Sequence, residues 1–213
     1  MKNLKGRCVF AQSGGPTTVI NASIAGGLLE ALENESVTGV LCAHHGLKGV
    51  LDEDFFDISL EDKAELEALK HTPASAFGSV RYKLKNPAED DTDYRRILEV
   101  FKKYDVRYFF YNGGNDSMDT CDKISKYMQK SGYDVNVIGI PKTIDNDLCG
   151  TDHCPGYGSA AKYIANSIME INRDASIYPS PLVVVVEIMG RNAGWLTAAS
   201  KLASVNGFGA DLI

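Results

Sequence analysis

Short runs of β-branched and aromatic residues alternate along the chain with longer stretches in which apolar side chains recur every three or four positions. The short runs predict strands, and the longer stretches predict amphipathic helices. The predicted strands are 7–12, 37–43, 106–111, 135–140 and 182–188, and the predicted helices are 18–32, 60–69, 91–104, 116–130, 159–172 and 193–204. Helices of this length connect strands by right-handed crossovers. We therefore expect an α/β fold: a doubly wound, mostly parallel sheet with helices on both faces.

The most apolar of these strands, 182–188, has the sequence LVVVVEI. A continuous aliphatic run is typical of a strand that is buried on both faces of a parallel sheet. Residues 211–213 predict the beginning of one more strand. We divide the chain into a first domain, 1–140, and a second domain, 141–213, which is only begun and looks truncated.

Composition narrows the classes of function. The net charge is −6 and no basic stripe is visible, which argues against a nucleic-acid partner. No aliphatic run approaches the roughly 18 residues of a membrane span, and the N-terminus has no signal-peptide pattern, so we expect no membrane partner. Five scattered cysteines suit reduced thiols in the cytoplasm. The residues 149–154 could suggest a metal site, but they lack a second ligand pair, so a polar loop is the preferred interpretation.

Four loops directly follow predicted strands, at 12–17, 112–117, 141–150 and 189–194, and all are rich in Gly, Asn, Asp or Arg. In a doubly wound sheet, ligands bind beyond the carboxyl ends of the strands. Glycines in the first two loops allow backbone N–H groups to approach an anion at a helix N-terminus. Each of these two loops is also consistent with a tight turn, because neither has the spacing of a nucleotide-binding motif.

The third loop carries the most chemistry. Its segment PKTIDND, at 141–147, places two carboxylates, a hydroxyl, an amide and a lysine directly after a strand. A carboxylate there can act as a general base toward a hydroxyl, while Lys142 offsets charge on a phosphate. Asp and Asn also form solvated turns, so that interpretation stays open. In the fourth loop, Arg191 can pair with a phosphate or simply lie on the surface.

Five segments together resemble the phosphofructokinase family in their order and spacing. They are SGGPTT at 13–18, GGNDS at 113–117, PKTIDND at 141–147, PGYGSAAKY at 155–163 and EIMGRNAGW at 187–195. The resemblance covers essentially the whole chain, and PKTIDND together with MGR is its most specific part. It implies a phosphoryl-donor-binding domain at 1–140 and the start of a sugar-phosphate-binding domain at 141–213.

The resemblance also implies roles for individual residues. Asp145 is the implied base that takes the proton from the 1-hydroxyl of fructose 6-phosphate, with Lys142 and Arg81 as further catalytic residues. The implied donor-binding residues are Gly14, Gly15, Gly114, Asp116 and Ser117. The implied substrate-binding residues are Thr143, Asp145, Met189, Gly190 and Arg191, and Thr143 and Asp147 are implied to support the reacting hydroxyl.

Two positions bear on the identity of the donor. ATP-using relatives commonly have glycine at the positions of Asp116 and Lys142. An aspartate at 116 would crowd and repel a nucleotide α-phosphate, whereas Lys142 would steady the leaving phosphate of diphosphate. The resemblance further implies Mg²⁺ as cofactor, held by Asn115 and Asp116. Many relatives have aspartate at position 115, and the amide oxygen of Asn115 is a weaker, neutral ligand.

The implied reaction is phosphoryl transfer from diphosphate to fructose 6-phosphate, giving fructose 1,6-bisphosphate and phosphate in glycolysis. The alternatives are the same reaction with ATP, and a non-catalytic regulatory or sugar-phosphate-binding subunit. A lipid or NAD kinase does not fit the PKTIDND and MGR segments. Full-length family members are expected to form homo-oligomers. Because they continue well past residue 213, we expect this chain alone to be inactive.

Overall fold

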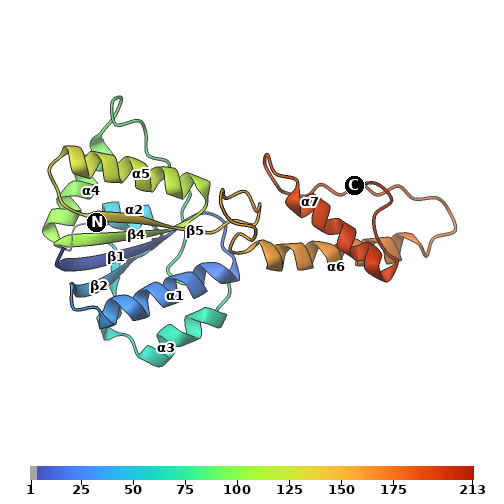
Figure 1. The fold of residues 1–213 in the computed structure, drawn as a ribbon, viewed down its shortest axis with the longest axis horizontal. Coiled ribbons are helices and arrows are strands. Elements are labelled where there is room, and N and C mark those ends of the chain that lie inside the picture. Colours follow the sequence, from blue (N-terminus) through green and yellow to red (C-terminus); the bar gives the residue numbers. More distant parts are fainter. Residues whose placement is uncertain (1–3) are drawn as a thin grey trace. The chain divides into compact units, whose positions relative to one another are not determined.

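The computed structural model describes residues 4–213, which form two compact units, one ending at Lys142 and the other beginning at Thr143 (Figure 1). The first unit is built on a five-stranded sheet with the order β3–β2–β1–β4–β5. The strands are β1 (Gly6–Gln12), β2 (Val37–Ala43), β3 (Phe55–Asp57), β4 (Val106–Gly113) and β5 (Asn136–Pro141). All neighbours pair in parallel except β2 and β3. The strand order reverses between β1 and β4, so the predicted doubly wound, mostly parallel sheet is confirmed.

The helices of the first unit cover both faces of this sheet (Figure 1). They are α1 (Thr18–Glu33), α2 (Leu47–Asp52), α3 (Lys63–Ala68), α4 (Thr92–Lys103) and α5 (Asn115–Lys130), with 3₁₀ helices at Ile58–Leu60 and Leu69–His71. Helix α4 shows why the sequence pattern was informative, since its buried side chains are Tyr94, Ile97, Val100 and Phe101. Their spacing of three or four residues forms one apolar stripe against the sheet.

Alternate residues along each strand supply two separate cores. Val9 and Ala11 of β1 face the core that is shared with α2, α4 and α5. Cys8 and Phe10 face the opposite core, which α1 and α3 complete. The Phe10 ring stacks on that of Phe110 in β4, with ring centroids 4.7 Å apart. This two-layer burial holds the carboxyl ends of β1, β4 and β5 in register at one edge of the sheet.

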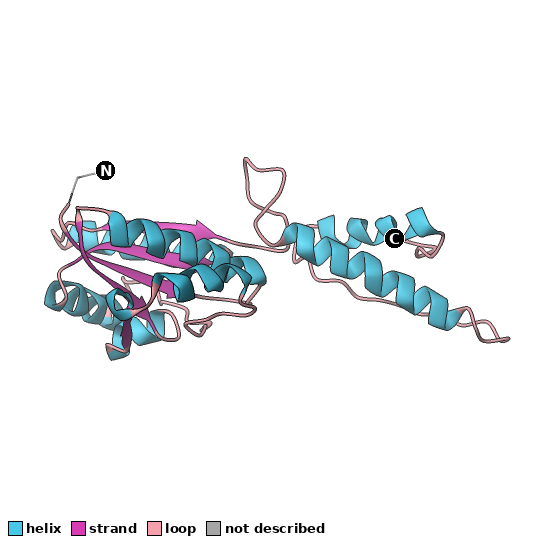
Figure 2. Cartoon of the chain, turned by 90° about the horizontal axis from the view of Figure 1, so that it is seen from below, coloured by secondary structure: helices cyan, strands magenta, loops and turns pink. Residues whose placement is uncertain are grey.

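The regular elements of the second unit, within residues 143–213, are helices joined by long loops. Helix α6 (Tyr157–Ala175) lies beside α7 (Trp195–Ala199) and the 3₁₀ helix Ser200–Asn206 (Figure 2). The apolar contacts of this unit are small, because its buried helical residues are mostly alanine. The buried apolar residues of these three helices are Ala161, Ile168, Leu196, Ala199 and Ala203.

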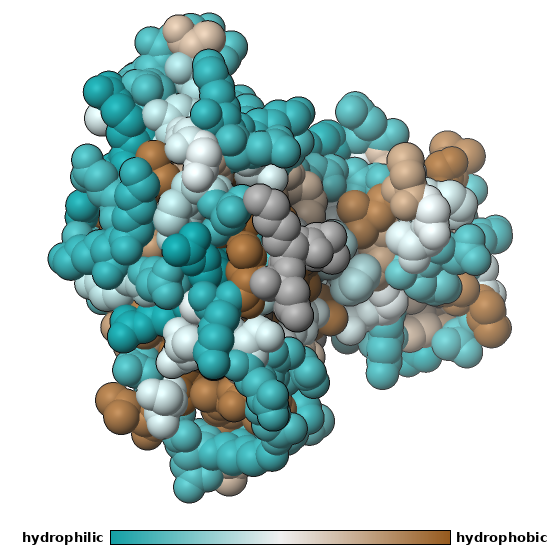
Figure 3. Space-filling view, turned by 60° about the vertical axis from the view of Figure 1, so that its left-hand side comes forward, coloured by the Kyte–Doolittle hydropathy of each residue, from teal (hydrophilic) through white to brown (hydrophobic). Residues whose placement is uncertain are grey.

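Two predicted strands are wrong. The segment 182–188 forms no strand, and Val183 and Val185 are 89% and 90% exposed. Residues 211–213 also form no strand. A strand exists only when a neighbour supplies its hydrogen bonds, and among the described residues no segment pairs with 182–188. Most apolar side chains of this segment are consequently exposed. Figure 3 shows that apolar residues reach the surface of the molecule at several places.

Candidate functional site

The turn after β1 is shaped by a glycine in the left-handed region. Gly14 has φ 79°, which a residue with a Cβ adopts only with strain. The turn leads into α1 through Thr17, whose side chain makes no capping hydrogen bond. The Ser13 amide donates to the carbonyl oxygen of Asn112 at 2.9 Å, which ties the end of β1 to the end of β4. The turn therefore lies at the carboxyl ends of β1 and β4, where the strand order of the sheet reverses.

Lys142 reaches this turn from the end of β5. Its amide donates to the carbonyl oxygen of Gly113 at 2.9 Å. Its side chain is 6% exposed, and the ammonium group donates a hydrogen bond to the carbonyl oxygen of Gly15. Burial lowers the pKa of Lys142 from its ordinary value, and the positive charge of Arg81 lowers it further. A buried ammonium group of this kind is stabilised by an anion.

Arg81 approaches the same turn from a different loop. A Cβ placed on Gly15 would lie 3.8 Å from its Nη2 atom. The Ser79 hydroxyl donates to the carbonyl oxygen of Gly14 at 2.6 Å, and the Ser13 hydroxyl donates to that of Val80 at 3.0 Å. Within the described residues, neither Arg81 nor Lys142 forms an ion pair. Two cations thus converge on the glycine turn, and neither has a carboxylate partner in the part of the chain that the structure describes.

The N-terminus of α5 completes this corner of the first unit. A Cβ on Gly113 would lie 2.1 Å from the Ser117 hydroxyl oxygen, so glycine is required for the tight entry into the helix. Gly114 is the N-cap, Asp116 lies exposed in the first turn, and Ser117 is buried. Helices α1 and α5 begin after neighbouring strands, and neither N-cap residue, Thr17 or Gly114, makes a side-chain capping hydrogen bond. Their partial positive charges favour a bound anion.

The beginning of the second unit is a hydrogen-bonded loop rather than a solvated turn. The Asp145 amide donates to the Thr143 hydroxyl oxygen at 3.1 Å, and that hydroxyl lies 3.3 Å from a carboxylate oxygen of Asp147. Asn146, with φ 56°, donates to the carbonyl oxygen of Asp152 at 3.1 Å and accepts from the Cys154 amide at 2.8 Å. These contacts fix the backbone around Asp145, whose side chain is half-buried.

The MGR segment lies in a separate loop of the second unit. Met189 and Arg191 are exposed, and Arg191 has φ 47°. The carbonyl oxygen of Gly190 accepts from the Ala193 amide at 2.6 Å, which closes the turn before α7. A Cβ on Gly190 would clash with the backbone of the same turn, because it would lie 2.2 Å from the carbonyl oxygen of Ala193. The turn therefore needs glycine at this position.

The structure groups most of the predicted site residues into two sets and leaves Met189, Gly190 and Arg191 in a separate loop before α7. Gly14, Gly15, Arg81 and Lys142 meet in the first unit, while Thr143, Asp145 and Asp147 meet in the second. The roles of all these residues stay predictions. Sequence reasoning did not identify the hydroxyl groups of Ser13 and Ser79 as the contacts that join the two loops. A serine beside glycine in each loop was the available signal.

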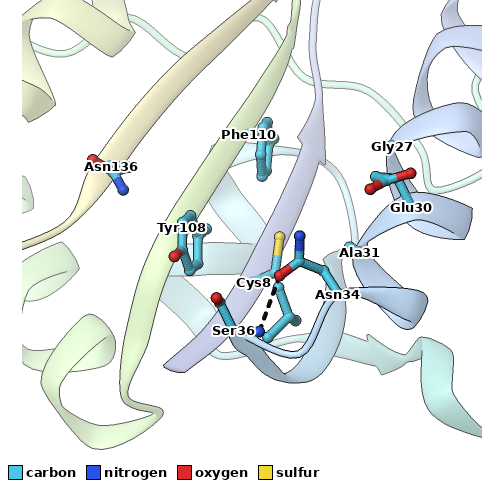
Figure 4. A pocket seen from close by; sticks show the side chains of 10 residues that line it. Cys8, Gly27, Glu30, Ala31, Asn34, Ser36, Tyr108, Phe110 and Asn136 are labelled. Atoms are coloured by element: carbon cyan, nitrogen blue, oxygen red, sulfur yellow. Dashed lines mark hydrogen bonds between the residues drawn. The ribbon is translucent and has the colours of Figure 1, made fainter. Parts of the chain in front are cut away.

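Other features of the described residues do not add to the site. No group of three or more His, Cys, Asp or Glu side chains is arranged to hold a metal among residues 4–213. Likewise, no helix in that range has the length and apolar character required to cross a membrane. A hollow of about 470 Å³ includes Cys8, Val37, Tyr108 and Asn136 in its lining (Figure 4). These residues lie toward the amino ends of their strands, at the opposite edge of the sheet from the glycine turn.

The known proteins that are similar to this chain can be aligned with it over more than nine-tenths of its length. A pyrophosphate–fructose 6-phosphate 1-phosphotransferase of Halomonas elongata is 51% identical over 198 residues, which are 91% of this chain and 47% of the relative. One of the same name from Methylococcus capsulatus is 50% identical over 198 residues, 92% of this chain and 47% of that protein. The chain thus spans about half the length of the curated relatives it matches.

The comparison with solved structures agrees. A pyrophosphate-dependent phosphofructokinase from Nitrosospira multiformis superimposes with a TM-score of 0.84 at 47% identity, covering 93% of this chain and 49% of the other. The phosphofructokinase family model matches residues 7–213. The five sequence segments, the doubly wound sheet and these matches agree, and the chain belongs to the phosphofructokinase family.

Proposed function

We propose that the protein containing this chain transfers a phosphoryl group from diphosphate to the 1-hydroxyl of fructose 6-phosphate. The products are fructose 1,6-bisphosphate and phosphate. The observation that carries the proposal is the convergence of Lys142 and Arg81 on the Gly14–Gly15 turn, where neither has a carboxylate partner among residues 4–213. The names of the relatives support the choice of both substrates.

In this proposal, the hydroxyl oxygen attacks the terminal phosphorus of diphosphate. The new phosphorus–oxygen bond forms as the bridging bond breaks, and the other phosphate leaves with the electron pair. Asp145 accepts the hydroxyl proton. The backbone contacts of Thr143 and Asn146 support this role, because they hold the loop that presents the carboxylate. Lys142 and Arg81 offset the charge that develops on the leaving phosphate.

Diphosphate binds, in the proposal, at the turn of Gly14 and Gly15 and at the N-terminus of α5. There Gly114, Asp116 and Ser117 form the wall of the donor site. The exposed carboxylate of Asp116 would repel the α-phosphate of a nucleotide. Met189, Gly190 and Arg191 contact the sugar phosphate, which Arg191 can hold by charge-assisted hydrogen bonds. This loop is exposed, as a binding loop must be.

The described residues are compatible with Mg²⁺ that is bound largely through the substrate. Mg²⁺ retains waters and commonly uses one or two carboxylates together with phosphate oxygens, so a cluster of three acidic side chains is not needed. Asp116 and the amide oxygen of Asn115 would hold the ion at the start of α5. When bound, it neutralises phosphate charge.

The five free cysteines support a reducing compartment such as the cytoplasm.

Binding and activity test the proposal separately. Calorimetric titration of the 213-residue chain with diphosphate or ATP, each with Mg²⁺, should give a signal for diphosphate only. A coupled assay on the longest available polypeptide containing this sequence should then show turnover of fructose 6-phosphate with diphosphate. Turnover with ATP alone would favour the ATP-dependent alternative. Binding of fructose 6-phosphate without turnover with either donor would favour a non-catalytic subunit.

A further inference from the structure

Two buried amide side chains lie behind the glycine turn. Gln12 ends β1, Asn21 lies in the first turns of α1, and both are 0% exposed. The Gln12 side-chain nitrogen donates to the Asn21 side-chain oxygen at 3.0 Å and to the carbonyl oxygen of Ile20 at 3.4 Å. Burying two amides is unfavourable unless their hydrogen bonds are satisfied, so the partners of the remaining atoms are informative.

Those remaining atoms all bond to a single loop, 72–77. The Gln12 side-chain oxygen accepts from the Ser75 hydroxyl at 2.8 Å and from the Phe77 amide at 3.0 Å. The Asn21 side-chain oxygen accepts from the Ala76 amide at 2.9 Å, and its nitrogen donates to the carbonyl oxygen of Thr72 at 2.8 Å. The amide pair is therefore the attachment point of this loop on the end of β1 and the start of α1.

The same loop continues directly into the donor site. The carbonyl oxygen of Phe77 accepts from the His45 amide at 2.8 Å, and Gly78 turns against the His45 ring with φ 71°. The next residues, Ser79 and Val80, hydrogen-bond to the glycine turn, and Arg81 follows with its guanidinium group near Gly15. Three residues thus separate Phe77, whose amide bonds to the buried Gln12 side chain, from the exposed cation Arg81.

We propose that Gln12 and Asn21 are positioning residues that hold Arg81 over the glycine turn for diphosphate. The inference rests on the proposed function, but it assigns a task to two residues that are fully buried. A cation that is already held in its binding geometry loses less conformational freedom when the anion binds. Loosening the loop at 72–77 should therefore weaken diphosphate binding through Arg81, and not through the glycine turn itself.

A double-mutant cycle on the 213-residue chain isolates this effect. Asn21→Ala should weaken diphosphate binding about tenfold in calorimetric titration with Mg²⁺, and should add no loss in a chain that already carries Arg81→Met. Ser75→Ala removes a half-buried hydroxyl that donates to the Gln12 side-chain oxygen and to the carbonyl oxygen of Gly78. It serves as the milder second variant, with a smaller loss that also vanishes in the Arg81→Met background. Equal losses in both backgrounds would overturn the proposal.

A matched control and a ligand-free measurement complete the test. Tyr133→Phe removes buried hydrogen bonds to the carbonyl oxygens of Phe101 and Val106, so it should lower thermal stability without changing diphosphate affinity. Amide hydrogen exchange at 76–81 should accelerate in Asn21→Ala and in Ser75→Ala, but not in Tyr133→Phe. Unchanged exchange there would contradict the proposal. If the parent chain binds no diphosphate, the proposed function is wrong, and the exchange result alone decides whether the amide pair holds the loop.

Discussion

The buried ammonium group of Lys142 hydrogen-bonds to the carbonyl oxygen of Gly15, 127 residues earlier in the chain. The contact joins the end of β5 to the turn after β1, across the end of β4 that lies between them in the sheet. Lys142 is desolvated and lies near a second cation, Arg81, so its charge destabilises the fold when no anion is present. Stability and anion binding should therefore respond in opposite directions to its removal.

Replacing this charge with an apolar side chain of similar length tests that expectation. Lys142→Met should raise the thermal midpoint of the chain near neutral pH and weaken diphosphate binding roughly 10- to 100-fold. The pKa of Lys142 is lowered in the folded state, so the unfolded state binds more protons between that lowered value and 10.5. The free energy of unfolding of the parent should consequently rise with pH through this interval, and the difference from Lys142→Met should shrink.

The matched control is Lys126→Met, which removes a charge from an exposed ion pair with Asp122 on α5. It should leave diphosphate affinity unchanged, since exposed pairs of this kind contribute little. A Lys142→Met chain that binds diphosphate as tightly as the parent would remove Lys142 from the donor site.

Much of the first unit could be predicted from the sequence because its periodic segments are long. Two elements were missed: β3 has three residues, and α2 contains Gly49, which reads as a helix breaker. The structure shows the reason for that glycine, since a Cβ there would lie 2.0 Å from the carbonyl oxygen of His44. A packing requirement of this kind leaves no periodic signal.

The candidate site was also predictable in part. The rule that ligands bind at the carboxyl ends of strands identified the loops of Gly14 and Lys142. It could not place Arg81 beside Gly15, because the loop that carries Arg81 follows no strand. The segment 182–188 was assigned to a buried strand from its composition, although strand formation depends on a pairing neighbour that composition cannot reveal.

The proposed base can be tested by an isosteric change. Asp145→Asn keeps the side-chain shape but removes the proton acceptor, so turnover should fall by roughly 10²- to 10⁴-fold with little change in sugar affinity. The measurement is kcat and KM for fructose 6-phosphate in a longer polypeptide that contains this sequence and is active. Asp152→Asn, in the same loop and exposed, is the control and should retain turnover. Near-normal turnover of Asp145→Asn would exclude Asp145 as the base.

Donor choice is predicted to depend on Asp116 and Lys142 together. Changing both to glycine should remove the repulsion of a nucleotide α-phosphate and the cation that steadies diphosphate. The expected result is a lower kcat/KM with diphosphate and a measurable kcat/KM with ATP. Asp119→Gly, one turn further along the exposed face of α5, controls for loss of helix propensity. The prediction would be contradicted if the double variant had no measurable kcat/KM with ATP and an unchanged kcat/KM with diphosphate.

Outside the donor site, a contact that is sensitive to acid joins the end of α2 to α4. Glu53 accepts hydrogen bonds from Arg96 at 2.7 Å, Lys103 at 2.5 Å and Tyr104 at 2.9 Å. Together, led by Lys103, they lower the pKa of Glu53 from 4.5 to about 2. Its stabilising contribution should therefore be complete above pH 4.5 and disappear as the pH falls toward about 2.

Glu53→Gln makes this linkage measurable. The variant should be less stable than the parent in urea at pH 7, and the difference should narrow as the pH falls from 4.5 toward 2. Lys103→Met removes one of the partners and should reproduce part of the loss at pH 7. A difference between parent and Glu53→Gln that is independent of pH would show that the loss arises from packing and not from the carboxylate charge.

The exposed aliphatic run at 182–188 should make the 213-residue chain associate with itself. Val183 and Val185 are 89% and 90% exposed, and a contiguous apolar segment of this kind favours intermolecular contact. Val183→Lys with Val185→Lys should lower the concentration-dependent sedimentation coefficient without changing the circular dichroism spectrum, because neither side chain is packed and lysine opposes association along an extended segment. Thr151→Lys with Ser180→Lys adds the same charge at exposed polar positions and separates the local effect from a general gain of positive charge. If both double variants reduce association equally, net charge rather than the apolar run controls it.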